Sequence, residues 1–304
     1  MPTGAGSLDA VTDQTDPYVV HWAEKVAGLL EIAQDDRPWY DELAGWLLRP
    51  ADRVAVDIGC GGGGMTLALA AAMDAGGQVV AVDAERELLA AVRDQATASG
   101  TDGLAEVTLV LADLGDGVES VREAMAAPAD LVWASAAVHH VGDQQMAINA
   151  LASLLAPAGR LALAEDGLPA RHLPWDLGVG APGLEQRLDA ANDRWFARMR
   201  EELPGSVPMP YGWTEALRRA GLTGVSTRTF LHERPSQLQT RDIERVIDRF
   251  TRWVDRIRPT GFLATADLEA WDRLLDPADP AWLAHRSDLF SLAARSVHVG
   301  ERMG

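Results

Sequence analysis

The chain has 304 residues, of which 47% are hydrophobic and 24% charged, a balance typical of a soluble globular protein with a sizeable core. The net charge of -18 and the lack of a basic stripe argue against a nucleic-acid substrate and against binding to anionic membrane surfaces. No apolar run approaches the ~18 residues that span a bilayer, no signal pattern opens the sequence, and the single cysteine excludes an internal disulfide. We therefore expect a cytoplasmic protein.

The first fifty residues fall into two parts. Residues 1–16 are rich in Gly, Thr and Asp and have little to bury, which predicts a flexible tail. Residues 17–50 carry apolar side chains three and four positions apart, in two segments separated near Pro38. This spacing predicts two amphipathic helices that form an N-terminal cap.

Residues 54–70 carry the most informative pattern of the chain. The apolar run Val-Ala-Val-Asp-Ile predicts a buried strand, the glycines that follow predict a sharp turn, and residues 65–70 predict a helix. Glycines at such a turn let a ligand approach the main chain with no Cβ in the way. Asp57 stands two residues before the first glycine, which gives the pattern Asp-x-Gly-x-Gly-x-Gly.

Two further predicted strands end in a carboxylate. Residues 78–83 end at Asp83, and residues 107–112 are followed by Asp113. Asp83 lies 20 residues beyond Gly63, the offset at which an acidic residue binds ribose hydroxyls. A cap for the following helix is compatible with that role.

The strand, the glycine turn and Asp57 together resemble motif I of the class I S-adenosylmethionine (SAM)-dependent methyltransferases, in particular the small-molecule type with motifs like those of ubiquinone and menaquinone biosynthesis. The resemblance implies a Rossmann-like α/β fold with a seven-stranded sheet, an N-terminal helical cap and helical insertions before the last strands. It implies SAM as cofactor and S-adenosylhomocysteine as product. The implied cofactor-binding residues are Asp57, Gly59, Gly61, Gly63, Asp83, Ala84, Asp113, Leu114, Ala134 and Ser135.

A fourth strand is predicted over residues 129–135, and His139 and His140 follow it. This region resembles motif IV of small-molecule methyltransferases and lacks the Asn/Asp-Pro-Pro-Tyr signature of amino-group methylation on bases or glutamine. Ligands bind at the carboxyl ends of such strands, and histidine is suited to act as a general base near neutral pH. We expect His139 first, and His140 second, as the catalytic base; a role in shaping the pocket wall stays open for both.

Weaker candidates for the acceptor side are Glu165, Asp166, His172 and Trp175, which follow the fifth predicted strand. A metal-dependent mechanism would need converging oxygen ligands, for which Asp113, Asp166 and Asn192 could be imagined. No spacing in the sequence supports that set, so no metal is expected.

The remaining chain alternates helices and strands. The expected strands cover residues 160–165, 224–232 and 296–302, and the expected helices cover residues 145–155, 184–203, 213–220, 243–257, 266–275 and 282–294. The predicted organisation after the cap is a SAM-binding core (51–166), a substrate-side insertion (167–212), a helical lid insertion (235–292) and remaining sheet elements (213–234 and 293–304).

These observations favour methyl transfer from SAM to a small organic molecule, most readily to oxygen, with nitrogen or carbon as further acceptors. Two alternatives stay open. One is a protein of the same fold that uses SAM or its pocket for decarboxylation, hydroxylation or cyclisation, because fold does not fix function. The other is a non-catalytic SAM-binding protein. The expected partner is a small-molecule acceptor, without nucleic acid or membrane, and a homodimer is an open question.

Overall fold

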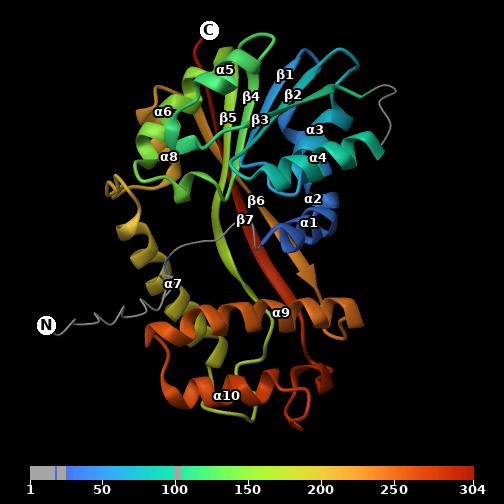
Figure 1. Ribbon diagram of the computed structural model, residues 1–304, viewed down its shortest axis with the longest axis vertical. Helices are drawn as coiled ribbons and strands as arrows, with labels where there is room; N and C mark the ends of the chain where they lie inside the picture. Colours follow the sequence, from blue (N-terminus) through green and yellow to red (C-terminus); the bar gives the residue numbers. More distant parts are fainter. Residues whose placement is uncertain (1–17, 19–24, 99–103) are drawn as a thin grey trace, which may run out of the picture.

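A sheet with the strand order β3-β2-β1-β4-β5-β7-β6 runs through the molecule in the computed structural model, which describes residue 18 and residues 25–98 and 104–304 (Figure 1). The seven strands found in these residues are β1 (Val54–Ile58), β2 (Gln78–Asp83), β3 (Glu106–Leu111), β4 (Ala129–Ser135), β5 (Leu155–Arg171), β6 (Thr223–Arg234) and β7 (Ser291–Glu301). Pairings β3-β2-β1-β4-β5 are parallel, and β7 is antiparallel to both β5 and β6. The predicted Rossmann-like fold with a seven-stranded sheet is confirmed.

Helices cover both faces of this sheet, and others form a separate body at one end of it. The helices of the described residues are α1 (Val26–Asp35), α2 (Arg37–Leu47), α3 (Gly64–Ala72), α4 (Arg86–Ala98), α5 (Glu119–Ala124), α6 (Gln144–Ser153), α7 (Leu184–Glu202), α8 (Trp213–Arg219), α9 (Thr240–Ile257) and α10 (Thr265–Leu275). Alternate residues of the strands point to opposite faces. Val56 and Val132 therefore pack with α5, α6 and α8, whereas Ala55 and Trp133 pack with α2 and α3.

The order of the strands reverses between β1 and β4, since β2 and β3 lie on one side of β1 and β5 lies beyond β4. In open α/β sheets, ligands bind at such a switch point, outside the carboxyl ends of the strands. The carboxyl ends of β1, β2 and β4 point in the same direction as the end of β5, toward the lower part of the molecule in Figure 1.

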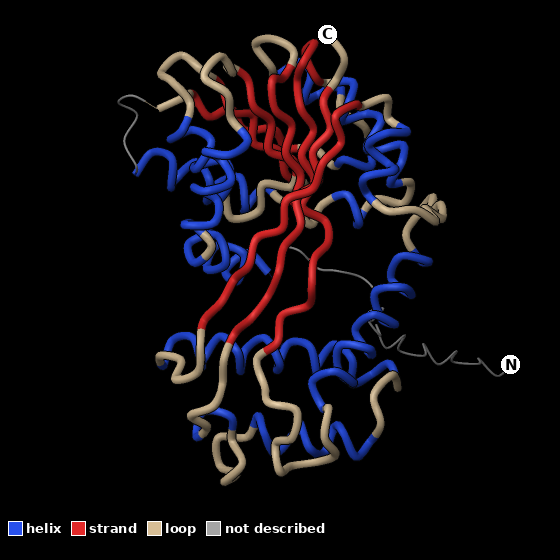
Figure 2. The backbone as a smooth tube through the Cα atoms, turned by 180° about the vertical axis from the view of Figure 1, so that it is seen from behind, coloured by secondary structure: helices blue, strands red, loops and turns tan. Residues whose placement is uncertain are grey.

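Strands β5, β6 and β7 extend well past the other strands and reach a second, helical body, here called the lobe (Figure 2). β5 and β6 run toward the lobe, and β7 runs away from it. The lobe contains α9, α10 and the first part of α7. Its core combines Leu188 and Trp195 of the first predicted insertion with Phe250 and Trp271 of the second. Segments far apart in the sequence therefore share one hydrophobic core at the far end of the long strands.

Most predicted elements differ from the observed ones by a few residues at their ends. Two differ more. The predicted strand 160–165 is part of the longer β5, and the helix predicted over residues 282–294 is wrong. That segment has a 3-10 turn at Leu283–His285 and then enters β7 at Ser291. Leu292 and Ala294 pair with both β5 and β6, and this pairing outweighs the helical preference of an alanine-containing segment.

Some predictions fall on residues that the structure does not describe. The tail 1–16 lies outside the described residues, and so do Val19 and Trp22 of the first predicted helix. Among the described residues, no helix is long and apolar enough to cross a membrane.

Candidate functional site

A cavity of about 400 Å3 lies at the carboxyl ends of β1, β2, β3 and β4, at the switch point of the sheet. This volume is in the range of small-molecule sites. Its wall contains most of the residues expected to contact the cofactor or the acceptor: Gly59, Gly61, Asp83, Ala84, Asp113, Leu114, Ser135 and His140.

The glycine loop forms the floor of this cavity. Gly59 has a φ of +66°, and a Cβ built on it would lie 2.8 Å from the Cβ of Ala137. Gly61 also has a positive φ, of +51°. Any larger residue at position 59 would therefore meet both a strained backbone and the chain that follows β4. Gly63 has a different role, because it does not line the cavity and a Cβ there would lie 2.8 Å from Cγ2 of Val92 on α4.

Asp57 lies beneath the loop and outside the cavity wall. Its side chain is buried, and its Oδ2 accepts a hydrogen bond of 2.6 Å from the Thr66 hydroxyl at the start of α3. Burial raises the pKa of the Asp57 carboxyl to about 7. In this arrangement the carboxyl fixes the strand to the helix that begins after the glycine turn.

Asp83 closes the cavity at the end of β2. Its Oδ2 accepts from the Gly61 N–H at 2.9 Å, and its Oδ1 accepts from the Glu85 N–H at 3.0 Å. A carboxylate oxygen has two acceptor positions, so each oxygen can accept one further bond. Burial raises the pKa of this carboxyl, and the two N–H donors counteract that effect.

Asp113 follows β3, the strand next to β2, and also lines the cavity. Its Oδ1 accepts from the Gly115 N–H at 2.8 Å, which caps the short turn Leu114–Asp116. Two carboxylates, from Asp83 and Asp113, thus stand in the wall of a cavity whose floor is glycine backbone. These acceptors suit a ligand with hydroxyl and amino donors, such as a nucleoside, and the residues present fit SAM.

His139 and Glu165 form a pair at the end of β4 and within β5. The Nδ1 atom of His139 lies 2.6 Å from Oε2 of Glu165, whose side chain is fully buried. The other Glu165 oxygen accepts from the N–H groups of Ala137 and Val138, at 3.0 and 2.9 Å. A carboxylate is an acceptor, so Nδ1 of His139 carries the proton, and Nε2 is left with its lone pair.

His140 differs from its neighbour in environment. It lines the cavity, its ring centroid lies 4.2 Å from that of His139, and burial together with the charges of His139 and Arg200 lowers its pKa to about 3. His140 is therefore neutral at physiological pH and is a weaker base than an ordinary histidine.

Arg200 of α7 holds the turn that carries both histidines. Its guanidinium donates to the carbonyl oxygens of His139 at 2.8 Å and of Gly142 at 3.1 Å, and to that of Val141. The sequence did not point to this residue, because α7 lies some sixty residues further along the chain and arginine is common on helix surfaces.

The N-terminal helices close over the glycine loop. Leu29 of α1 lines the cavity, and a Cβ on Gly62 would lie 2.5 Å from the carbonyl oxygen of Leu29. A Cβ on Gly64 would lie 2.4 Å from the Tyr40 ring of α2. Both helices thus pack on the loop, and α1 also forms part of the cavity wall.

Several weaker candidates lie away from this cavity. Ala134 is fully buried within β4, Trp175 is 63% exposed, and His172 lines a separate cavity. The Asp166 side chain is outside what the structure describes. Asn192 accepts a hydrogen bond of 2.8 Å from Arg256 within the lobe. In residues 25–98 and 104–304, no group of three or more His, Cys, Asp or Glu could hold a metal ion.

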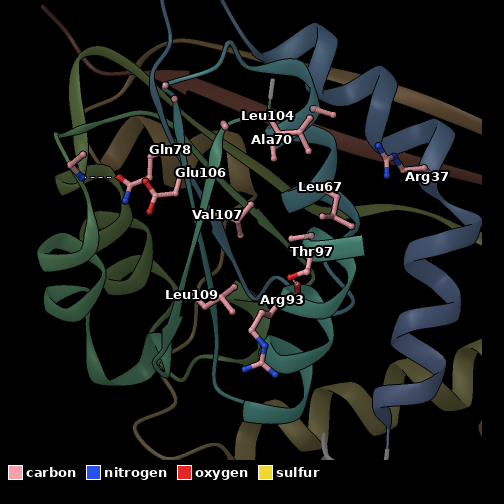
Figure 3. Close-up of a pocket in the computed structure, with 16 residues that line it drawn as sticks. Arg37, Leu67, Ala70, Gln78, Arg93, Thr97, Leu104, Glu106, Val107 and Leu109 are labelled. Atoms are coloured by element: carbon pink, nitrogen blue, oxygen red, sulfur yellow. Dashed lines mark hydrogen bonds between the residues drawn. The ribbon is translucent and has the colours of Figure 1, made fainter. Parts of the chain in front are cut away.

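A larger cavity, of about 790 Å3, lies against α3, α4 and β3 (Figure 3). Its side chains are mainly apolar, such as Leu67 and Val107, with Arg93 and Thr97 from α4. It also contacts Gln78 and Glu106, at the amino ends of their strands. None of the residues predicted to be functional lines it, so the smaller cavity at the switch point is the candidate site.

Comparison with known proteins agrees with this choice. Residues 56–161, which include β1, the glycine loop and β4, match a family model described as a methyltransferase domain. These residues therefore form a methyltransferase domain.

Two curated relatives are similar to the same part of the chain. The 27-O-demethylrifamycin SV methyltransferase of Amycolatopsis mediterranei (strain S699) is 33% identical over 126 residues, which are 41% of this chain and 43% of that protein. The ubiquinone biosynthesis O-methyltransferase of Xanthomonas axonopodis pv. citri (strain 306) is 34% identical over 116 residues, 38% of this chain and 44% of that protein. The chain thus matches less than half the length of these relatives.

Solved structures resemble the chain over a longer span at lower identity. A methyltransferase from Bacillus halodurans C-125 has a TM-score of 0.47 at 15% identity, covering 92% of this chain and 100% of that one. Phosphoethanolamine N-methyltransferase 2 of Haemonchus contortus, in complex with SAM, has a TM-score of 0.46 at 16% identity, covering 94% of this chain and 61% of that one.

Proposed function

We propose that this chain transfers a methyl group from SAM to a hydroxyl group of a small organic molecule. The observation that carries the proposal is the pair of His139 and Glu165, joined at 2.6 Å, on the turn that also places His140 in the wall of the cofactor cavity. A hydroxyl is a weak nucleophile at neutral pH, and an imidazole held by a carboxylate is the arrangement that removes its proton.

Different residues of the cavity wall bind different parts of SAM. Gly59 and Gly61 offer open backbone, the Asp83 carboxylate has acceptor positions for the two ribose hydroxyls, and Asp113 has one for the adenine amino group. When bound, SAM supplies a methyl carbon activated by its sulfonium. The protein's share of the chemistry is then to position the acceptor oxygen, exclude water and take up a proton.

His139 is the residue that we assign to proton uptake. Its Nε2 lone pair accepts the hydroxyl proton, and the resulting positive charge is stabilised by the carboxylate of Glu165, which already receives the Nδ1 proton. Phe196 of α7 packs against the His139 ring at a centroid distance of 5.4 Å and shields it from water. The His139 side chain is 18% exposed and does not itself line the cofactor cavity, so the acceptor oxygen would reach it from beside His140, which does.

Two further observations support a small-molecule hydroxyl acceptor. The net charge of -18 is unfavourable for a polyanionic substrate such as nucleic acid. The names of the two curated relatives describe methyltransferases of a rifamycin and of ubiquinone biosynthesis, the second an O-methyltransferase.

The test is a methylation assay on the full chain with a panel of phenolic and aliphatic hydroxyl compounds, read by the mass of the product. A gain of one CH2 in the acceptor, with S-adenosylhomocysteine formed in equal amount, is the expected result. His139→Gln should lose turnover while calorimetry shows unchanged SAM binding, and His285→Gln, at an exposed position of the lobe, should behave like the wild type. Full turnover in His139→Gln would remove the assigned base, and products without the added CH2 would favour non-methylating chemistry.

A further inference from the structure

A third cavity, of about 500 Å3, lies between α1, α2, α9 and the extended parts of β5, β6 and β7, and we call it the α9 cavity. It shares no lining residue with the cofactor cavity. These two cavities lie on neighbouring faces of α1, because Leu29 lines the cofactor cavity and Gly28 and Ile32 line the α9 cavity.

Four buried side-chain nitrogen atoms in the wall of the α9 cavity have neither a hydrogen bond nor an ion pair among the described residues: Nε1 of Trp39, Nε2 of His172, Nε2 of His232 and Nε of Arg249. A fifth, Nη2 of Arg245, has no hydrogen bond but lies in an ion pair with Asp35. The indole and guanidinium nitrogens carry hydrogen and can only donate. Buried donors in folded proteins nearly always have an acceptor. The unpaired donors of this wall therefore indicate that a bound ligand supplies the acceptor.

Arg249 has no carboxylate of the described residues bound to it, although the charge of Glu185 lies near. Its guanidinium packs over the Trp253 ring at 4.1 Å, and it forms no hydrogen bond or ion pair with the part of the chain that the structure describes. Burial lowers the pKa of Arg249 to about 10, so it remains protonated at neutral pH. The nearby Glu185 carboxylate is occupied by the N–H groups of His172 and Leu173, at 2.9 and 3.2 Å.

Two other arginines of the same wall are bound to carboxylates of the protein itself. Arg295 pairs with Asp36 at 2.6 Å, and Arg245 pairs with Asp242 at 3.1 Å and with Asp35. The carboxylates of Asp35, Asp36 and Asp242 also line the cavity, and each is bound to an arginine. Arg249 differs from both arginines, since its positive charge faces the cavity without a carboxylate bound to it.

His172 adds an acceptor to this wall. Nδ1 of His172 lies 3.3 Å from the carbonyl oxygen of Phe290, which can only accept, so Nδ1 carries the hydrogen and Nε2 has a lone pair. Burial lowers the pKa of His172 to about 4, and the ring is neutral at pH 7. The rest of the wall includes apolar side chains, among them Ile32, Leu238 and Val246.

We propose that the α9 cavity binds a small organic carboxylate, whose oxygens accept hydrogen bonds from Arg249 and from the indole N–H of Trp39 while its carbon skeleton lies against the apolar wall. Charge-assisted bonds from a guanidinium to a carboxylate are strong and directional, and they satisfy both orphaned donors. The inference goes beyond methyl transfer and uses no residue of the cofactor cavity, so it stands or falls independently.

The test uses the full chain labelled with 15N-tryptophan and benzoate as the probe. Saturable movement of the Trp39 indole N–H signal, assigned by its loss in Trp39→Phe, is expected as benzoate is added. Arg249→Met should weaken benzoate binding by about tenfold or more, the effect of losing a hydrogen bond to a charged group. Arg273→Met is the matched control, because it removes an exposed arginine of α10 in the same lobe, and neither Arg273 nor its partner Asp279 lines the cavity; its affinity should equal that of the wild type.

Several results would overturn the proposal. An unmoved Trp39 signal at saturating benzoate would mean that the cavity holds water alone, and equal affinity in Arg249→Met would remove the assigned donor. Inorganic phosphate binding as tightly as benzoate would exclude an organic ligand as the preferred one. If Arg249→Met does not fold, Arg249→Gln and Trp39→Phe test the same donors. Calorimetry of SAM binding, expected to be unchanged in every variant, separates failure of this site from failure of the methyltransferase site.

Discussion

The Nδ1 atom of His139 lies 2.6 Å from Oε2 of Glu165, although the two residues belong to different strand ends of the sheet. The Ser135 end of β4 and Ala164 of β5 are paired in the parallel ladder, and this register brings the turn after β4 beside the Glu165 side chain. Glu165 also accepts from the N–H groups of Ala137 and Val138, so one buried carboxylate both shapes the turn and orients the imidazole.

Glu165→Gln is expected to lower kcat by about 10- to 100-fold with little change in SAM affinity, as is usual when the partner that orients a functional histidine is lost. The amide can still accept from the turn but provides no negative charge for the imidazolium. Steady-state kinetics with calorimetric SAM titration measure both effects. Glu201→Gln, an exposed substitution on α7, is the control, and unaltered kcat in Glu165→Gln would contradict the assigned role.

Asp83→Asn is expected to weaken SAM binding by about 10- to 100-fold, because hydrogen bonds to a carboxylate are worth roughly 1.5–3 kcal/mol. The neighbouring turn residue Asp116 offers a comparison, since Asp116→Asn changes the same charge at an exposed position. Isothermal titration with SAM and with S-adenosylhomocysteine gives the affinities. Equal affinities for the two variants would show that Asp83 does not contact the nucleoside.

Gly59→Ala is expected to abolish SAM binding and to destabilise the fold by about 1–2 kcal/mol, since an L-residue is unfavourable at positive φ. The added Cβ would also lie 2.8 Å from that of Ala137. A Cβ added at Gly45 of α2 would have no neighbouring atom within 4 Å, so Gly45→Ala should instead raise stability by up to about 1 kcal/mol. Urea denaturation of both variants measures this contrast, and a stable, SAM-binding Gly59→Ala would contradict the proposed floor of the site.

The raised pKa of the Asp57 carboxyl should appear in the pH dependence of the free energy of unfolding. The pKa of this group in the folded protein, about 7, lies above the ordinary value, so between about pH 4 and 7 the folded state binds more protons at this site than the unfolded state does. This group therefore makes the folded state less stable as pH rises through that window. Asp57→Asn can still accept from Thr66 and removes the effect.

The free energy of unfolding of Asp57→Asn relative to the wild type should therefore increase from pH 4.5 to pH 7.5, by on the order of 1 kcal/mol or more. Urea denaturation at several pH values measures the difference. Asp94→Asn, an exposed substitution in α4, should show no such trend. A constant difference for Asp57→Asn would mean that the buried carboxyl is already ionised at low pH.

The glycine loop and the strands around it were predictable because the decisive signals there are local. The apolar run of β1, the glycines and the acidic ends of β2 and β3 lie in sequence order and need no knowledge of distant partners. The same reasoning placed Asp57 with Asp83 and Asp113 around the ligand. In the structure Asp57 instead bonds to Thr66 within the turn, a local contact that the pattern alone does not distinguish from ligand binding.

Other features depend on contacts between distant segments. His139 and Glu165 were each considered separately, and only the register of β4 with β5 joins them. Arg200 reaches the histidine turn from α7, and residues 291–294 become strand because two neighbours pair with them. Local propensity carries no information on such pairings.

The three long strands have a consequence for how an acceptor of a given size would be selected. β6 and β7 pair without a register shift from Ser226 to Arg234, and β5 pairs with β7 over the same stretch with two register shifts, so tilting one body relative to the other would break hydrogen bonds between these strands. The separation of the two bodies is therefore set by strand length, not by a hinge. Variation in acceptor size is expected to be accommodated by exchange of side chains on α1, α7 and α9, with the backbone spacing preserved.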